Sequence, residues 1–228
     1  MKLINKIIFG TMSVNSKIHS IDVLKYALKN FKMFHLSSEY KSFNSVSKII
    51  REKKKTKLIV KLAEPGFNDS RFSEKRFLKK LNFYIKKLGK DKQISIQWMW
   101  RGDLSNETNR INNFIKDAKK IAKLFKYLIK KKIIKKVNVF PYTKSFLINS
   151  ILFNFFNGAC VYRNPMEKVY DNLVNEIKGF NFITIRPFGG NLKLIKKHKL
   201  KYLLNYSINN KNINNIILTC SKKNRLMR

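Results

Sequence analysis

The chain has 228 residues, 44% of them hydrophobic, which is long and apolar enough for the core of one α/β domain. Its 50 Lys and Arg residues against 13 acidic residues give a formal net charge of +37. No uninterrupted apolar stretch is long enough to cross a bilayer, which excludes a membrane-spanning protein. Residues 1–13 lack the small-residue cleavage site of a signal peptide, so a cytoplasmic protein is expected.

Short apolar runs recur along the chain at fairly even intervals. They are rich in Ile, Val and aromatic residues, as the buried strands of parallel sheets are. The runs span residues 6–10, 33–37, 57–62, 93–100, 135–142, 158–163, 181–187 and 215–220. Parallel neighbours need a crossover between them, usually a helix. The alternation therefore predicts an α/β fold, a (β/α)8 TIM barrel of parallel strands, with residues 1–228 forming a single domain.

The segments between the runs have a helical period. The clearest apolar stripe lies in 112–133, where residues from Phe114 to Phe125 recur at three- and four-residue steps. A second amphipathic helix is predicted over 71–89, where Gly89 is placed to end it. Further helices are expected over 20–30, 42–54, 143–154, 168–179 and about 192–207.

Two expectations concern the ends of the barrel. Ser20 is a good N-cap and is expected to begin the first helix. The last run is followed by few residues before Arg228, so the eighth helix of the barrel is expected to be short or absent. One outer face would then be thinly covered, unless a partner or a neighbouring copy covers it.

The cysteines and the charge distribution exclude several site types. Cys160 and Cys220 lie in the sixth and eighth runs without metal-ligand or CxxC spacing, so buried thiols in a reducing compartment and no metal site are expected. Most basic residues are lysines on the polar sides of predicted helices, whereas planar recognition of bases and phosphates favours arginine. A solvated basic surface is therefore favoured over specific nucleic-acid binding.

Two residues near the expected mouth of the barrel have a chemistry that fits together. Active sites of β/α barrels lie at the C-terminal ends of the strands. Lys61 lies within an apolar run, where a lysine is costly unless it is paired or its pKa falls. Tyr40 follows the second run, and a nearby lysine would lower the pKa of its phenol and help it to donate a proton. Alternatively, Lys61 snorkels to the rim and Tyr40 is an aromatic residue at a helix start.

Six segments occur in the order in which they occur in aldo/keto reductases. They are IIFGTM (7–12), FHLSSEY (34–40), VKL (60–62), NVFPYTKSFL (138–147), VYRNPMEK (161–168) and IRPFGGNL (185–192). From Ile7 to about Leu226 the chain thus resembles a short, divergent aldo/keto reductase. The resemblance implies a barrel that reduces a small carbonyl substrate with NADP(H) or NAD(H). The family uses a Tyr supported by a Lys, an Asp and a His.

At the catalytic positions the resemblance is incomplete. Tyr40 and Lys61 match the family's tyrosine and lysine, but His35 stands in place of the aspartate and Trp100 in place of the histidine. Without the carboxylate, Lys61 is expected to lose the partner that would orient it. Trp100 adds bulk, although its indole N–H can donate one hydrogen bond. His35 is either part of an alternative proton relay with Tyr40 or a structural histidine.

The resemblance also implies a cofactor site beside the last strands. Asn138, Phe140 and Cys160 replace the family's usual Gly, Ser and Gln. The implied cofactor-binding residues are Asn164, Arg186, Pro187, Phe188, Gly189, Ser221, Lys222 and Arg225. The last three are candidates for an adenosine 2′-phosphate, since backbone donors and cations at these loops suit a phosphate. A basic C-terminal tail is the alternative for them.

Three functions remain open from the sequence. The first is an aldo/keto reductase-like oxidoreductase with an altered site. The second is a catalytically inactive barrel that keeps a binding role, which the two departures at the catalytic positions favour. The third is a basic protein that binds RNA, an acidic glycan or an anionic surface, and it depends on the +37 charge alone.

Overall fold

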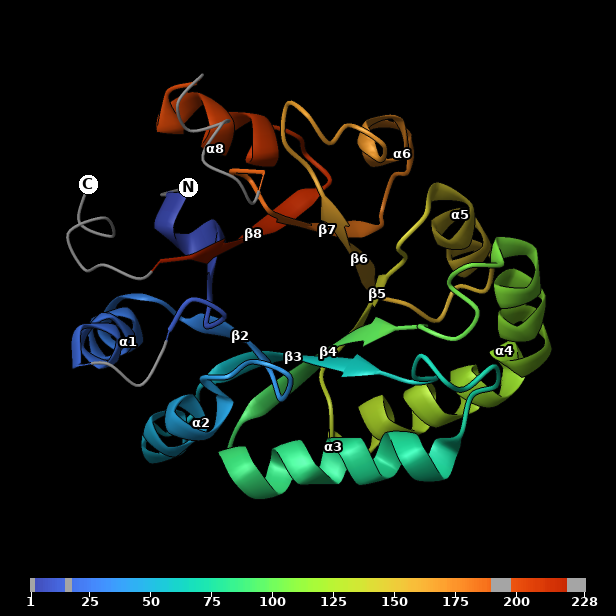
Figure 1. The fold of residues 1–228 in the computed structure, drawn as a ribbon, viewed down its shortest axis with the longest axis horizontal. Helices are drawn as coiled ribbons and strands as arrows, with labels where there is room; N and C mark the ends of the chain where they lie inside the picture. Colours follow the sequence, from blue (N-terminus) through green and yellow to red (C-terminus); the bar gives the residue numbers. More distant parts are fainter. Residues whose placement is uncertain (1–2, 15–17, 190–197, 221–228) are drawn as a thin grey trace.

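The structure is a computed structural model, and it describes residues 3–14, 18–189 and 198–220. Eight parallel strands pair in chain order, and β8 pairs with β1 to close the barrel (Figure 1). The strands are β1 (Ile7–Gly10), β2 (Met33–Ser37), β3 (Lys57–Ala63), β4 (Gln93–Met99), β5 (Val137–Phe140), β6 (Gly158–Tyr162), β7 (Asn181–Ile185) and β8 (Ile213–Thr219). Each predicted run forms a strand, and the predicted TIM barrel is confirmed.

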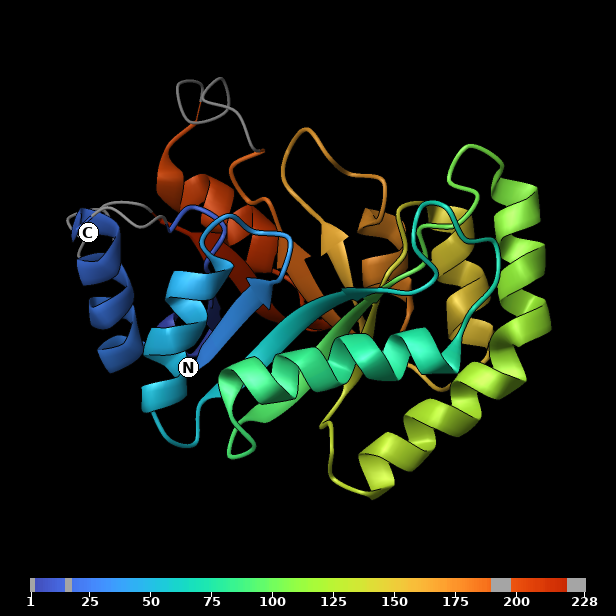
Figure 2. The same ribbon diagram turned by 60° about the horizontal axis from the view of Figure 1, so that its bottom comes forward.

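Helices surround the ring of strands, as Figure 1 and the turned view in Figure 2 show. They are the 3₁₀ helix η1 (Leu3–Lys6) and the α-helices α1 (Ile18–Asn30), α2 (Phe43–Glu52), α3 (Glu74–Leu88), α4 (Glu107–Lys130), α5 (Lys144–Leu152), α6 (Asp171–Glu176) and α8 (Leu200–Ile208). In the part of the chain that the structure describes, no helix is both long enough and apolar enough to span a bilayer.

The helix ends agree only in part with the predictions. Gly89 ends α3 with a φ of 101°, which glycine adopts readily. The prediction of Ser20 as an N-cap is wrong, because α1 already includes Ile18 and a helix cap lies outside the helical turns. Of the helix predicted over 192–207, the structure describes α8, and residues 190–197 lie outside the described part. The predicted absence of an eighth helix concerns residues 221–228, which also lie outside it.

Side chains of successive strand residues point to opposite sides of the barrel wall. One set forms the barrel interior: Ile8, Ile59, Met99, Phe140, Cys160, Ile183 and Ile217. The larger set packs between the strands and the helices. Cys160 is buried as expected, whereas Cys220 follows the end of β8 and is only half-buried.

Trp100 belongs to the outer set, which corrects its expected place at the mouth. It is fully buried, with its ring centroid 6.0 Å from that of Trp98 and 5.9 Å from that of Phe114 on α4. Its indole nitrogen has no hydrogen-bond partner among the described residues. Because side chains alternate, the β4 residues that face the interior near the C-terminal end of the strand are Gln97 and Met99.

Candidate active site

A cavity of about 470 Å³ lies inside the barrel at the C-terminal ends of the strands, a volume typical of small-molecule sites. Of the predicted site residues, it brings together His35, Tyr40, Lys61, Arg186, Pro187, Phe188 and Gly189. Gln97, Met99, Phe140, Tyr142 and Tyr162 complete much of its wall. None of the described residues that line it is acidic.

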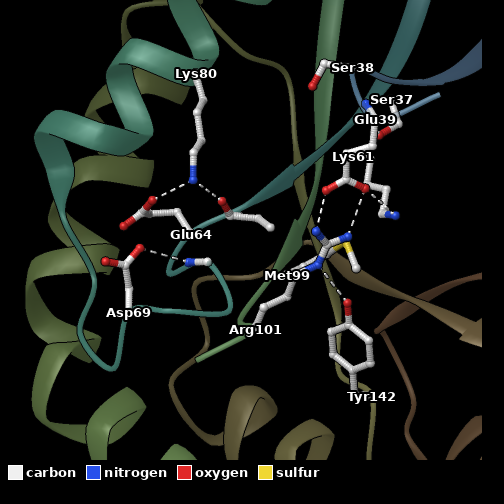
Figure 3. Close-up of polar contacts among 12 residues, drawn as sticks. Ser37, Ser38, Glu39, Lys61, Glu64, Asp69, Lys80, Met99, Arg101 and Tyr142 are labelled. Carbon is white, nitrogen blue, oxygen red and sulfur yellow. Dashed lines mark hydrogen bonds and ion pairs between the residues drawn. The ribbon is translucent and has the colours of Figure 1, made fainter. Parts of the chain in front are cut away.

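Glu39 lies just outside the cavity, and its carboxylate binds two cations, Lys61 and Arg101. The Lys61 Nζ atom lies 2.9 Å from one carboxylate oxygen of Glu39, and a guanidinium nitrogen of Arg101 lies 2.9 Å from the same oxygen. Figure 3 shows Arg101 between Glu39 and Tyr142, whose hydroxyl accepts a hydrogen bond from the Arg101 Nε at 3.0 Å. The expectation that Lys61 lacks a carboxylate partner is therefore wrong, because Glu39 supplies it from a neighbouring position.

The charge state of Glu39 follows from its surroundings. Its partial burial raises the pKa, but hydrogen bonds from Arg101 and Lys61 outweigh this effect and lower the pKa to about 2. Glu39 is consequently ionised at neutral pH. Burial lowers the pKa of Arg101, but the hydrogen bond from Arg101 to Glu39 helps to raise it above its usual value.

Helix α3 holds the loop that carries Glu39 next to Lys61. The Tyr84 hydroxyl donates to the backbone carbonyl of Lys61 at 2.8 Å. It also accepts a hydrogen bond from the backbone N–H of Ser38 at 2.7 Å. One buried phenol thus links the end of β3 to the residue before Glu39.

Tyr40 lies beside Lys61, but its pKa moves in the direction opposite to the expected one. The ammonium of Lys61 lies 6.0 Å from the Tyr40 ring centroid. Burial raises the pKa of the phenol, and the negative charge of Glu39 adds to this increase. The expected lowering is wrong because burial, together with the nearby Glu39 carboxylate, outweighs any effect of the Lys61 charge. Tyr40 is therefore protonated at neutral pH and can donate its hydroxyl proton.

His35 is neutral and bonded to the barrel interior. It is buried, and its Nε2 lies 2.5 Å from the side-chain oxygen of Gln97, so the assigned tautomer has the proton on Nε2. Burial lowers its pKa to about 4, with the charge of Lys61 acting in the same direction. Its ring centroid lies 6.1 Å from that of Tyr40, and no hydrogen bond joins the two in the described chain. This geometry favours the structural histidine over the proton relay.

The turn after β7 closes one side of the cavity. Arg186 has a φ of 55°, and the backbone N–H of Gly189 donates to its carbonyl at 2.9 Å. The Arg186 guanidinium lies 4.4 Å from the ring centroid of Tyr162. It also lies 3.9 Å from Glu167, and about half of its side-chain surface remains exposed. The turn thus places the Arg186 cation over the Tyr162 ring of β6 at the cavity wall.

Asn164 supports this turn and does not line the cavity. It is fully buried, and its amide nitrogen donates to the carbonyl of Arg186 at 2.9 Å. Its side-chain oxygen accepts from the backbone N–H groups of Met166 and Glu167 at 3.0 and 3.1 Å. Asn164 therefore reaches a ligand only through the position of Arg186. Ser221, Lys222 and Arg225 lie outside the described residues.

Structural comparison relates this barrel to solved enzymes. A protein assigned as an aldo-keto reductase from Pseudomonas aeruginosa superposes with a TM-score of 0.71, at 11% identity over 97% of this chain and 86% of that chain. An aldo/keto reductase from Brucella melitensis gives 0.67 at 15% identity, covering 97% and 84%. An aldose reductase from Giardia lamblia gives 0.63 at 13% identity, again covering 97% and 84%. The chain has the aldo/keto reductase fold. No family model and no curated protein matches the sequence.

Within this aldo/keto reductase fold, sequence reasoning missed several residues of the site. Glu39 precedes Tyr40 directly, and an acidic residue at a strand end in so basic a chain was the signal that could have identified it. Arg101 lies just after β4, so its place at a strand end could have identified it as well. Met99 and Tyr162 could be identified only by knowing which side chains point into the barrel. The alternation along β4 and β6 separates them from Trp100 and Val161.

Proposed function

We propose that this chain is an aldo/keto reductase-like oxidoreductase that reduces a small carbonyl substrate with NADPH or NADH, in the cytoplasm. One observation carries the proposal. Tyr40 and Lys61 line the same cavity at the C-terminal end of the barrel, and Glu39 gives Lys61 the carboxylate partner that the sequence lacked at position 35.

Each residue has a definite task in this proposal. Tyr40, protonated at neutral pH, donates its proton to the oxygen of the substrate carbonyl as negative charge develops there. Lys61 places a positive charge beside that oxygen, and Glu39 fixes the direction of the lysine side chain. The apolar wall residues Met99 and Phe140 exclude water from the reacting group.

The residues around the cavity fit a nicotinamide dinucleotide. Arg186, which lies over the Tyr162 ring, offers a partly exposed cation for a phosphate oxygen, and Tyr142 lines the wall beside it. Pro187, Phe188 and Gly189 shape the turn beside them. Ser221, Lys222 and Arg225 are proposed for a 2′-phosphate on the resemblance alone. When bound, the dinucleotide supplies the hydride.

A second candidate function is a barrel that binds the dinucleotide without reducing a carbonyl. Two observations favour it. Met99, the interior-facing residue at the end of β4, has no strong hydrogen-bond donor to polarise a carbonyl. In addition, the raised pKa of Tyr40 makes its phenol a weaker acid.

Cofactor titration followed by turnover separates these functions. We expect saturable binding of NADPH or NADH, measured by nicotinamide fluorescence, and slow reduction of small aldehydes. Tyr40→Phe should lower kcat by about 100-fold, because it removes the proton donor while leaving the ring in place. Tyr127→Phe, at an exposed phenol on α4, is the matched control.

Each result decides between the candidates. Binding without turnover in the unmodified protein would support the second function. Absence of binding at millimolar concentrations of both dinucleotides would contradict both functions. Turnover that Tyr40→Phe leaves unchanged would remove Tyr40 from the mechanism.

A further inference from the structure

A second cavity, of about 330 Å³, lies at the opposite end of the barrel, where the strands begin. Its wall is formed by residues at or near the first positions of β2, β3, β4, β5, β7 and β8. The lining residues include Lys57, Gln93, Ser95, Lys135, Lys136, Asn138, Asn181, Asn214 and Asn215. The cavity is therefore polar, and it is separate from the candidate active site.

The charge around this cavity has one sign. Lys57, Lys135 and Lys136 line it, and no described lining residue is acidic. In the described chain none of the three lysines forms an ion pair, in contrast to Lys61 at the other end. Like charges around a shared cavity repel one another, and a bound anion would relieve this repulsion.

Asn138 adds a directional donor inside the cavity. The residue is only 4% exposed, it lines the cavity, and its side-chain amide has no hydrogen-bond partner among the described residues. Its neighbours differ in this respect, because the amide nitrogens of Asn181 and Asn215 donate to the backbone carbonyls of Asn157 and Lys6, each at 3.1 Å. Because this unpartnered amide reaches the cavity, its N–H groups are available for a ligand that enters there.

We propose that this cavity binds a small phosphate-bearing anion. The three lysines supply the attraction, and the N–H groups of Asn138 donate to a phosphate oxygen. A small anion fits better than a polymer, because Asn138 lies within the barrel and a polymer would contact only the rim lysines. The site is independent of the proposed carbonyl chemistry at the other end.

Inorganic pyrophosphate tests the site by isothermal titration calorimetry at about 150 mM NaCl, where surface charges are largely screened. We expect one saturable site. The triple variant Lys57→Gln/Lys135→Gln/Lys136→Gln should raise the Kd by at least about 10-fold. The matched variant Lys119→Gln/Lys123→Gln/Lys126→Gln removes the same charge from the exposed face of α4 and should change the Kd by less than about 2-fold.

Asn138 provides a test without any change of charge. Asn138→Leu should raise the Kd by about 5-fold through the loss of the amide donor. If that variant does not fold, Asn138→Asp should abolish binding by placing a negative charge in the cavity. Equal weakening by the two triple variants, or an Asn138 variant that folds and binds like the unmodified protein, would overturn the site in favour of bulk electrostatics. Arg186→Gln, at the mouth of the barrel, should leave pyrophosphate binding unchanged, which separates this site from the phosphate contact proposed for the dinucleotide.

Discussion

At the mouth of the barrel, Lys61 and Arg101 both donate to the carboxylate of Glu39. The carboxylate is partly exposed, so each pair contributes little to stability in solvent. Its effect is on position: Arg101 is held towards Glu39 and Tyr142, and Lys61 is held at the edge of the cavity. The carboxylate of Glu39 therefore orients Lys61 even though position 35 holds a histidine.

The alternation along β4 gives a prediction at the same scale. Met99→His should place an imidazole in the cavity, because this side chain faces the interior. Under the proposed function the new donor should raise kcat/KM for small aldehydes by about 10-fold or more. Steady-state kinetics with saturating NADPH measures the effect.

Trp100→His is the matched control for that variant. Its side chain would point into the apolar layer against α4, so it should give no gain in activity. It should also lower the free energy of unfolding by about 3 kcal/mol, since a large buried aromatic ring is lost. A gain with Trp100→His but none with Met99→His would show that the direction of these side chains is wrong.

At the scale of elements, Glu64 joins the end of β3 to the start of α3. It is fully buried, and Figure 3 shows it in contact with Lys80, whose ammonium lies 2.8 Å from a carboxylate oxygen. Arg76 donates to the other oxygen at 2.9 Å, and the backbone N–H of Ser73 donates to it at 3.1 Å. Because Ser73 is the N-cap of α3, Glu64 fixes where this helix begins.

Glu64→Ala should therefore destabilise the protein. We expect the free energy of unfolding in urea to fall by about 1–3 kcal/mol, because the half-buried backbone N–H of Ser73 loses its acceptor while both cations can turn to solvent. Glu74→Ala, at an exposed carboxylate in the first turn of α3, should change it by less than about 0.5 kcal/mol. Equal effects of the two substitutions would contradict the anchoring role of Glu64.

At the scale of the whole molecule, the barrel could be predicted from the sequence because segments of strand period and helix period alternate clearly. Helix α4 begins at Glu107, five residues before the predicted start at 112, because its first turns are mostly polar and conceal the apolar stripe. The pair of Glu39 and Lys61 could not be predicted, since it depends on the register between β2 and β3, which places Ser37 beside Lys61. The position of Trp100 required the register of β4, and a shift of one residue reverses the direction of a side chain.

The net charge of +37 also belongs to this scale, and it predicts how stability responds to salt. Self-repulsion destabilises the compact state, and the screening length falls from about 30 Å at 0.01 M salt to about 3 Å at 1 M. We therefore expect the Tm to rise with NaCl concentration, as measured by circular dichroism.

In Lys119→Glu/Lys126→Glu each substitution lowers the net charge by two, so the variant should have a higher Tm at low salt and a smaller response to NaCl. The triple variant at Lys57, Lys135 and Lys136 should keep most of that response, because the repulsion is spread over the whole surface whereas the proposed anion site is local. A Tm that is constant or falls with NaCl would show that the surface lysines are too dispersed or too well solvated for their repulsion to affect folding.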